Sequence, residues 1–181
     1  MRDIFYGLFA VLLAAGLFIP AGAKAAKKEK LPVAVAQYHL LDGKWDGTAQ
    51  RLEEGGALTP FDTRMVCDKV AEGWAIACNI EGESNTAGEP VTFNEAHLIG
   101  IDPVSGAGRW FSIASGGTIR ERLAEWTDSR TLFARARWDT PDGPAEETIT
   151  YSFGGKKNLS FRTVITIAEK RVFEMTGTLE R

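Results

Sequence analysis

Three side chains in the middle of the chain are of the types that nucleophilic catalysis needs. Ser112 offers a hydroxyl, His97 an imidazole that can accept its proton, and Glu121 a carboxylate that could orient the imidazole. The Gly-x-Ser-x-Gly turn that presents the nucleophile in many hydrolases does not surround Ser112. A hydrolase-like enzyme is therefore the weakest of our functional hypotheses, and we assign no catalytic residue.

The sequence favours no metal site. Its two histidines, His39 and His97, lie far apart in the chain, and no cluster of His, Cys, Asp and Glu has the spacing of a metal-binding motif. We therefore expect neither a metal ion nor another cofactor.

The elements that would position the chemical groups are strands. Turn signals rich in Gly, Pro, Asp and Ser recur about every ten residues, and no long segment has a helical hydrophobic period. This pattern predicts an all-β fold, an antiparallel up-and-down β-barrel of about ten strands, with a sandwich as the other arrangement. The expected strands cover residues 43–52, 61–70, 74–83, 90–101, 108–115, 117–126, 130–139, 145–153, 158–167 and 171–180.

The turns also predict which residues face each other. A two-residue turn at Gly116-Gly117 would pair Ser112 with Glu121, and one at Asp128-Ser129 would pair Glu121 with Ala136. The later hairpins continue the same face. The expected inner face then contains Trp110, Ser112, Ala114, Ile119, Glu121, Leu123, Leu132, Ala134, Ala136, Trp138, Glu147, Ile149, Tyr151, Phe153, Leu159, Phe161, Thr163, Ile165, Ile167, Phe173, Met175, Gly177 and Leu179.

This inner face mixes bulky, small and polar side chains. Small residues opposite large ones indicate either close packing or the outline of a cavity. Polar groups favour a cavity for a small, partly hydrophobic ligand, because a buried Glu121 needs a donor, a cation, water or a ligand. A local strand twist would instead turn Glu121 to solvent, and Glu125 and Glu147 are expected nearer the rim. The predicted ligand-binding residues are Trp110, Ser112, Glu121, Ala134, Ala136, Trp138, Tyr151 and Phe161.

Two registers remain open for the strand that contains His97, because the sequence does not determine the length of the turn at residues 102–106. One register turns Glu95, His97 and Ile99 inward, with His97 approaching Ser112. The other turns the neighbouring residues inward and leaves His97 on the surface.

The two cysteines predict a disulfide bond. A two-residue turn at Glu72-Gly73 would place Cys67 directly opposite Cys78, and a longer turn is the alternative. Such a bond suits an oxidising compartment, whereas two buried free thiols would not require one.

The outer face is predicted to carry two pairs of facing arginines beside apolar side chains. Like charges that face each other destabilise a sheet unless anions, carboxylates or solvent compensate them. The surface is therefore either a site for an anion or a protein partner, or a set of solvated arginines stacked over rings. The residues are Arg120 with Arg137 and Arg122 with Arg135, next to Phe111, Ile113 and Phe133.

The N-terminus has the pattern of an export signal. An apolar run at residues 4–19 ends at Pro20, and cleavage is expected after Ala23 or Ala25. We expect a periplasmic or secreted protein without a stable membrane span after processing. Lysines that follow the apolar run leave an N-terminal membrane anchor as the alternative. The expected divisions are a signal peptide at 1–23, a basic segment with a short helix near 33–41 at 24–42, and the barrel domain at 43–181.

Composition limits the classes of partner. The chain has 181 residues, 44% of them hydrophobic, which suits one domain with a sizeable core. Its net charge of -3 offers no general attraction for nucleic acid, so we expect none as a partner.

Three short motifs carry a family resemblance. Gly43-Lys44-Trp45-Asp46-Gly47 opens the first strand, Gly100-Ile101-Asp102-Pro103 forms a turn, and Arg109-Trp110-Phe111-Ser112 follows it. Over roughly residues 40–181 the chain resembles lipocalin-like, or calycin, β-barrels, and in particular an uncharacterised bacterial family of lipocalin-like domains of unknown function. Ile101 stands where that family usually has an aromatic residue.

The resemblance implies a container for a small apolar ligand and no catalytic residues. It also implies that Trp45 plugs the closed end of the barrel, under Arg171 or Arg181. We therefore expect an exported small-molecule-binding barrel. The alternative is a non-enzymatic envelope protein, structural or interacting, that uses the outer arginine and aromatic face to bind a protein partner or a second copy.

Overall fold

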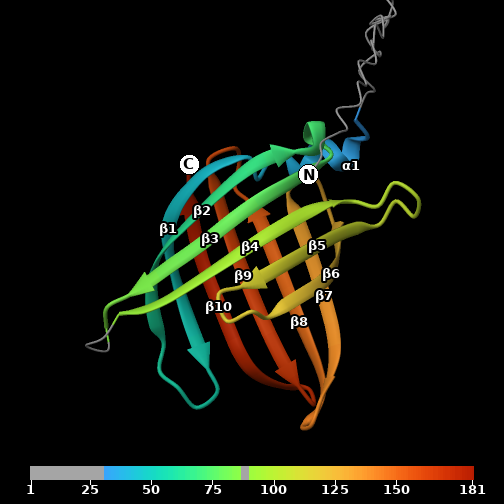
Figure 1. Cartoon of the computed structure of the whole chain (residues 1–181). Helices are drawn as coiled ribbons and strands as arrows, with labels where there is room; N and C mark the ends of the chain where they lie inside the picture. Colours follow the sequence, from blue (N-terminus) through green and yellow to red (C-terminus); the bar gives the residue numbers. More distant parts are fainter. Residues whose placement is uncertain (1–30, 87–89) are drawn as a thin grey trace, which may run out of the picture. The chain divides into compact units, whose positions relative to one another are not determined.

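The structure, a computed structural model, describes residues 31–86 and 90–181. The expected signal peptide and the first part of the basic segment lie outside the described residues. In the described part, ten antiparallel strands form one closed barrel, in which each strand pairs with its chain neighbours and β1 pairs with β10 (Figure 1). No helix among these residues is long and apolar enough to span a membrane.

The predicted all-β barrel is confirmed, and each strand begins and ends within two residues of its predicted bounds. The strands are β1 (Gly43–Glu53), β2 (Thr59–Val70), β3 (Ala75–Ser84), β4 (Val91–Ile101), β5 (Gly108–Ala114), β6 (Ile119–Trp126), β7 (Thr131–Thr140), β8 (Gly143–Phe153), β9 (Asn158–Ile167) and β10 (Lys170–Glu180). A short helix, α1 (Val33–Tyr38), precedes them, and the 3-10 turn η1 (Ala71–Gly73) connects β2 to β3.

The barrel is closed at the end that α1 covers. Trp45 is fully buried there, and its indole N–H donates to the carbonyl of Leu41 at 2.8 Å. The guanidinium of Arg181 lies 4.2 Å from the centre of the Trp45 ring and donates to the carbonyl of Leu40. Arg181, rather than Arg171, is thus the residue that covers this tryptophan.

The motif at residues 43–47 ends in Gly47, whose lack of a side chain is needed for closure of the barrel. A Cβ on Gly47 would lie 2.0 Å from the carbonyl oxygen of Thr178, a backbone atom of β10. The glycine therefore lets β1 and β10 approach where the first and last strands pair.

The predicted facing of the last two strands is confirmed. Phe161 faces Gly177 and Thr163 faces Met175. The turn between β9 and β10 contains only Ala168 and Glu169, both with positive φ, which is the two-residue geometry that matches the twist of a hairpin.

The register of β6 differs from the prediction by one residue. The turn before it has three residues, 115–117, with Gly117 in the left-handed conformation at φ 79°. Ser112 therefore faces Arg120 instead of Glu121. Because a shift of one residue exchanges the two faces of a strand, Glu121 points outward and Arg120 points inward.

A second shift of one residue follows at the next turn. Residues 128–130 form another three-residue loop, closed by a hydrogen bond from the Thr127 N–H to the Thr131 carbonyl. This shift compensates for the first, so Ala134 and Ala136 face inward as predicted, and Ala134 faces Ala124.

The predicted pairs of facing arginines on the outer surface are wrong. Arg122 is 2% exposed and points into the barrel, and Arg120 lies on the same face. Arg135 and Arg137 do lie on the outer surface, as predicted. The cause is again the register of β6, since its two arginines alternate with Glu121.

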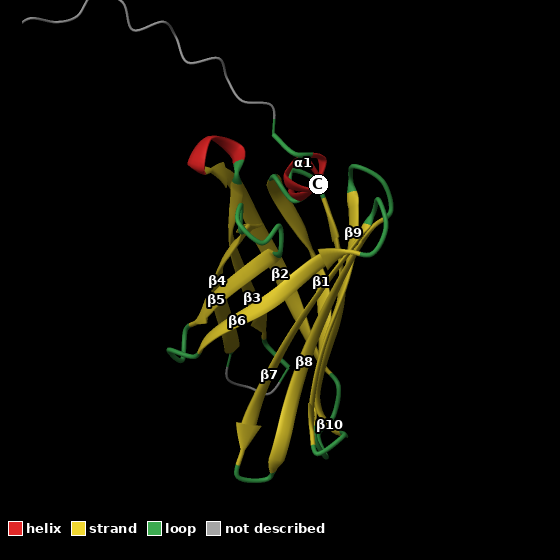
Figure 2. Ribbon diagram, turned by 90° about the vertical axis from the view of Figure 1, so that its right-hand side faces the viewer, coloured by secondary structure: helices red, strands yellow, loops and turns green. Residues whose placement is uncertain are grey.

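The ladder between β6 and β7 is short, and we call the separated part the β6–β7 split. Residues 123–126 pair with residues 132–135, but residues 119–122 of β6 have no ladder partner among residues 136–140 of β7. The two strands diverge there (Figure 2). Side chains cross the split, because the Arg120 guanidinium stacks on the Trp138 ring at 4.1 Å.

The structure contains the predicted disulfide bond. Cys67 faces Cys78 in the expected register, and both residues are buried. The connection is longer than the two-residue turn, because η1 and Trp74 separate the paired strands.

Removal of this disulfide should destabilise the barrel. The bond closes a loop with a sequence separation of 11, for which chain entropy predicts a loss of about 3 kcal/mol. Urea unfolding of the Cys67→Ala/Cys78→Ala variant measures the loss, and the wild type with added reductant is the control. Equal unfolding free energies for the oxidised wild type and the variant would contradict this prediction.

Candidate functional site

A cavity of about 290 Å³ lies inside the barrel, in the half away from Trp45. Its volume is at the lower end of the range for small-molecule sites. One side, which we call the polar wall, comes from β4, β5, β6 and β8 and consists of Glu95, His97, Ser112, Arg120, Arg122 and Glu147. The other side, the apolar wall, consists chiefly of Phe93, Phe161, Ile165, Phe173 and Met175.

Arg122 is the central residue of the polar wall. Its Nε donates to Glu147 Oε2 at 2.8 Å, its Nη2 lies 2.7 Å from the same oxygen, and its Nη1 donates to Ser112 Oγ at 2.8 Å. Glu147 is 5% exposed and Ser112 is 4% exposed. Arg122 and Glu147 thus form a buried ion pair, and Ser112 accepts a further hydrogen bond from Arg122.

Glu147 lies deeper than the rim position expected for it. The turn between β7 and β8 contains only Pro141 and Asp142, so Ala136 faces Glu147. Burial raises the pKa of Glu147, and the charges of Arg122 and Arg120 offset this effect only in part. The carboxylate therefore depends on these arginines to remain ionised inside the barrel.

His97 faces inward, in the first of the two registers left open by the sequence. Trp110 donates its indole N–H to His97 Nδ1 at 3.0 Å. Because an indole nitrogen can only donate, Nδ1 carries no proton, and the Nε2–H donates to Glu95 Oε2 at 2.8 Å. His97 is thus held as the neutral tautomer protonated at Nε2.

Glu95 completes this hydrogen-bonded chain. Burial raises its pKa, but the hydrogen bond from His97, the electrostatic attraction of the same imidazole and the positive charges of Arg122 and Arg120 together hold the pKa below its usual value. Glu95 therefore stays a carboxylate that faces the cavity.

The structure does not assemble the catalytic grouping considered for His97, Ser112 and Glu121. Glu121 lies on the outer face and pairs with Arg109 at 2.9 Å. Both ring nitrogens of His97 are engaged, and the Ser112 hydroxyl accepts from Arg122. Neither ring nitrogen of His97 is therefore free to accept the Ser112 proton in this arrangement.

The predicted ligand-binding residues are only partly brought together. Ser112, Tyr151 and Phe161 line the cavity. Burial raises the pKa of Tyr151, so its hydroxyl stays a neutral group at the cavity. Glu121 was predicted to face inward, and this was wrong.

The other predicted residues lie near the cavity without lining it. Trp110 is fully buried behind His97, Ala134 belongs to the core of the closed half, Ala136 faces Glu147, and Trp138 stacks on Arg120. Ligand binding by any of them stays a prediction.

Glycines let two rings of the apolar wall lie flat against the sheet. A Cβ on Gly177 would lie 2.5 Å from the Phe161 ring, and one on Gly82 would lie 2.1 Å from the Phe93 ring. Phe161, which faces Gly177 across the strands, therefore occupies the space above this glycine.

Four charged residues of the polar wall escaped the sequence prediction as ligand-binding candidates: Glu95, Arg120, Arg122 and Glu147. For Arg120 and Arg122, the signal was the number of residues in the turns before and after β6, because apolar and charged residues occur on both faces of this strand. A three-residue loop with Gly117 at its left-handed position would have turned Arg122 inward.

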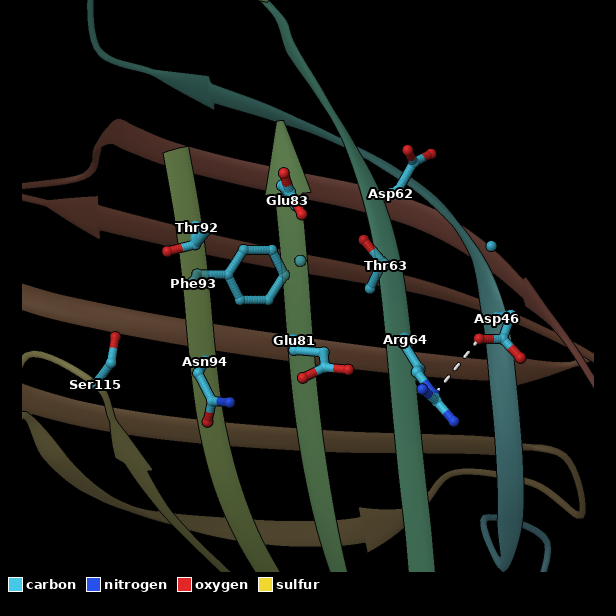
Figure 3. A pocket seen from close by; sticks show the side chains of 12 residues that line it. Asp46, Asp62, Thr63, Arg64, Glu81, Glu83, Thr92, Phe93, Asn94 and Ser115 are labelled. Atoms are coloured by element: carbon cyan, nitrogen blue, oxygen red, sulfur yellow. Dashed lines mark ion pairs between the residues drawn. The ribbon is translucent and has the colours of Figure 1, made fainter. Parts of the chain in front are cut away.

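A second hollow lies on the outer surface of β1 to β4 (Figure 3). Its charged side chains are exposed, and Arg64 pairs with Asp46 at 3.7 Å. Among the described residues, no group of His, Cys, Asp and Glu could hold a metal ion. The interior cavity is the better candidate site, because Arg122 and Glu147 in its wall are buried whereas the charged groups of the outer hollow are exposed.

Comparison with known proteins supports the fold alone. No family model and no curated protein matches the sequence. The S-type phycobiliprotein lyase CpeS from Guillardia theta aligns with a TM-score of 0.52 and 13% identity, over 83% of this chain and 97% of that protein. A DUF3598 protein of unknown function from Nostoc punctiforme aligns with a TM-score of 0.29 and 9% identity, over 83% of this chain and 100% of that protein. A TM-score this low does not establish a shared fold. The β-barrel fold is supported, and the lipocalin-like family suggested by the sequence motifs stays a prediction.

Breaking the buried ion pair should be costly. Glu147→Gln keeps the shape of the side chain but leaves Arg122 without its counter-charge, for which we expect a loss of about 3 to 5 kcal/mol in unfolding free energy. Glu146→Gln is the matched control, because Glu146 pairs with Arg137 on the exposed face of the same strand and should contribute less than about 1 kcal/mol. Urea unfolding compares the two variants, and equal losses would contradict the role assigned to the buried pair.

Proposed function

We propose that this protein is a small-molecule-binding β-barrel that holds a small, partly hydrophobic ligand in its interior cavity. The observation that carries the proposal is the pairing of a polar wall with an apolar wall around one space of about 290 Å³. Ligand pockets are mostly apolar, with a few placed polar groups that orient the ligand, and this cavity has both components.

The division of the barrel interior supports this proposal. The half near Trp45 is filled by closely packed side chains, among them Leu41, Leu132 and Leu159, each at most 1% exposed. Packing there fixes the strands, so the cavity in the other half is bounded by a rigid frame.

The structure weakens the alternative of an envelope protein that binds a partner through its outer arginine and aromatic face. It depended on four arginines beside exposed rings, and two of them, Arg120 and Arg122, point inward. We therefore do not propose an envelope interaction protein as a second function.

We also propose that the protein is exported to an oxidising compartment. The apolar run at residues 4–19, the cleavage pattern at Ala23 or Ala25 and the Cys67–Cys78 bond support this localisation.

Filling the cavity should abolish ligand binding. Thr163 lies on the inward face of β9, so Thr163→Phe places a benzyl group in the space the ligand would occupy. We expect saturable fluorescence enhancement of the neutral probe N-phenylnaphthylamine with the wild type, and at least about tenfold weaker binding by the variant. Thr150→Phe, on the outward face of β8, is the control and should bind like the wild type. Absence of saturable binding by the wild type would remove the support for a binding barrel.

Export should leave a defined N-terminus. If the full chain is expressed in a bacterium with a periplasm, we expect periplasmic protein that begins at Lys24 or Ala26. N-terminal sequencing and intact mass of the purified protein test this, with Ala23→Arg/Ala25→Arg as the uncleavable control. A cytoplasmic protein that retains Met1 would refute export.

A further inference from the structure

We infer that the ligand of this barrel is an amphipathic monoanion, a carboxylate or sulfonate on a compact apolar body, and that Arg120 binds its anionic group. This inference rests on the proposed binding function and specifies the chemical class of the ligand.

The charges around the cavity are the first step of the argument. The lining includes three arginines, Arg51, Arg120 and Arg122, but only two carboxylates, Glu95 and Glu147. His97 is held neutral by the donor from Trp110. The groups that face the cavity therefore carry one excess positive charge, which a single anion would compensate.

The rim does not cancel this excess inside the cavity. Arg51 has a carboxylate neighbour in Glu53, with its Nε 3.4 Å from Glu53 Oε1, but the Glu53 side chain is 62% exposed. A solvated carboxylate screens an arginine weakly, so the interior remains favourable for negative charge.

Of the two arginines in the polar wall, Arg120 is the one with free donors. Arg122 makes two contacts with Glu147 and one with Ser112, whereas Arg120 Nε lies 3.6 Å from Glu147 Oε2, beyond hydrogen-bond distance. No hydrogen bond joins the Arg120 guanidinium to any residue in the ranges 31–86 and 90–181. Its donors are therefore available to a ligand.

The position of Arg120 suits recognition of an anion. Its guanidinium stacks on the Trp138 ring at 4.1 Å, and its side chain is 27% exposed. Stacking fixes the guanidinium plane and leaves its N–H edges free, which is the geometry that binds a carboxylate or sulfonate in a bidentate manner.

The two walls then place the two parts of the ligand. Arg120 lies at the β6–β7 split, so the anionic group would be held beside this opening in the ladder. The rings of Phe161 and Phe173 lie on the apolar wall, where they would contact the apolar body. A ligand with a charge at one end and an apolar body at the other matches this arrangement.

The volume limits the size of the apolar body. A cavity of about 290 Å³ has room for the volume of about ten water molecules. At the packing density of a protein interior, an aromatic body of about three rings or a short alkyl chain fits this space.

The test uses two fluorescent probes that share one apolar body. Anilinonaphthalene sulfonate carries a sulfonate, and N-phenylnaphthylamine is neutral. We expect the wild type to bind the sulfonate at least about tenfold more tightly, since a charge-assisted pair contributes about that factor. Thr163→Phe should abolish both signals, which shows that each probe occupies the cavity.

Substitution of Arg120 identifies the residue that recognises the charge. Arg120→Gln should weaken binding of the sulfonate about tenfold and leave the affinity for the neutral probe within about twofold. Arg135→Gln, an arginine on the outer face of β7, is the matched control and should leave both affinities unchanged.

The outcomes separate this inference from the proposed function. Equal or tighter binding of the neutral probe by the wild type would overturn the monoanion inference and leave the binding barrel intact. A preference for the sulfonate that persists in Arg120→Gln, or an equal loss of both probes, would overturn the role of Arg120. Failure of both probes to bind the wild type saturably would count against the proposed function itself.

Discussion

The buried guanidinium of Arg122 is the group on which the arrangement of the cavity depends. An arginine that is 2% exposed inside a barrel requires a counter-charge and partners for its donors, and Glu147 and Ser112 provide them from two other strands. Because β5, β6 and β8 are joined by this contact, one face of the cavity is polar and fixed. A separate hydrogen-bonded chain lies on the same wall, in which the indole of Trp110 sets the tautomer of His97 and His97 donates to Glu95 on β4.

The barrel combines two different interiors along one set of strands. Near Trp45, apolar side chains pack closely and α1 covers the end, whereas the other half carries ionic groups around a space. Close packing stabilises a fold, but a buried ion pair is weak evidence for stability. Under the proposed function, the buried charged groups serve to bind a ligand, and the closely packed half supplies the stability that they do not.

Much of the fold follows from the sequence, and the content of the cavity follows from it only in part. Turn signals and alternation predict ten strands, the facing of Phe161 and Gly177, and the bond between Cys67 and Cys78. The facing of β6 could not be predicted by hydrophobicity, because Ile119 is 69% exposed and Leu123 is 58% exposed, while Arg122 is buried. It depended on whether a loop has two or three residues, a difference that exchanges every side chain on the strand.

The β6–β7 split has a consequence for the protein in a crowded compartment. Two strand edges with unpaired amides and carbonyls can recruit a strand from another molecule, which is the first step of aggregation. Arg137 and Asp139 alternate along the outward side of the β7 edge, and charges at such positions disfavour intermolecular pairing. Arg120 crosses to Trp138 over the same edge, so the opening that we assign to recognition is also protected from self-association.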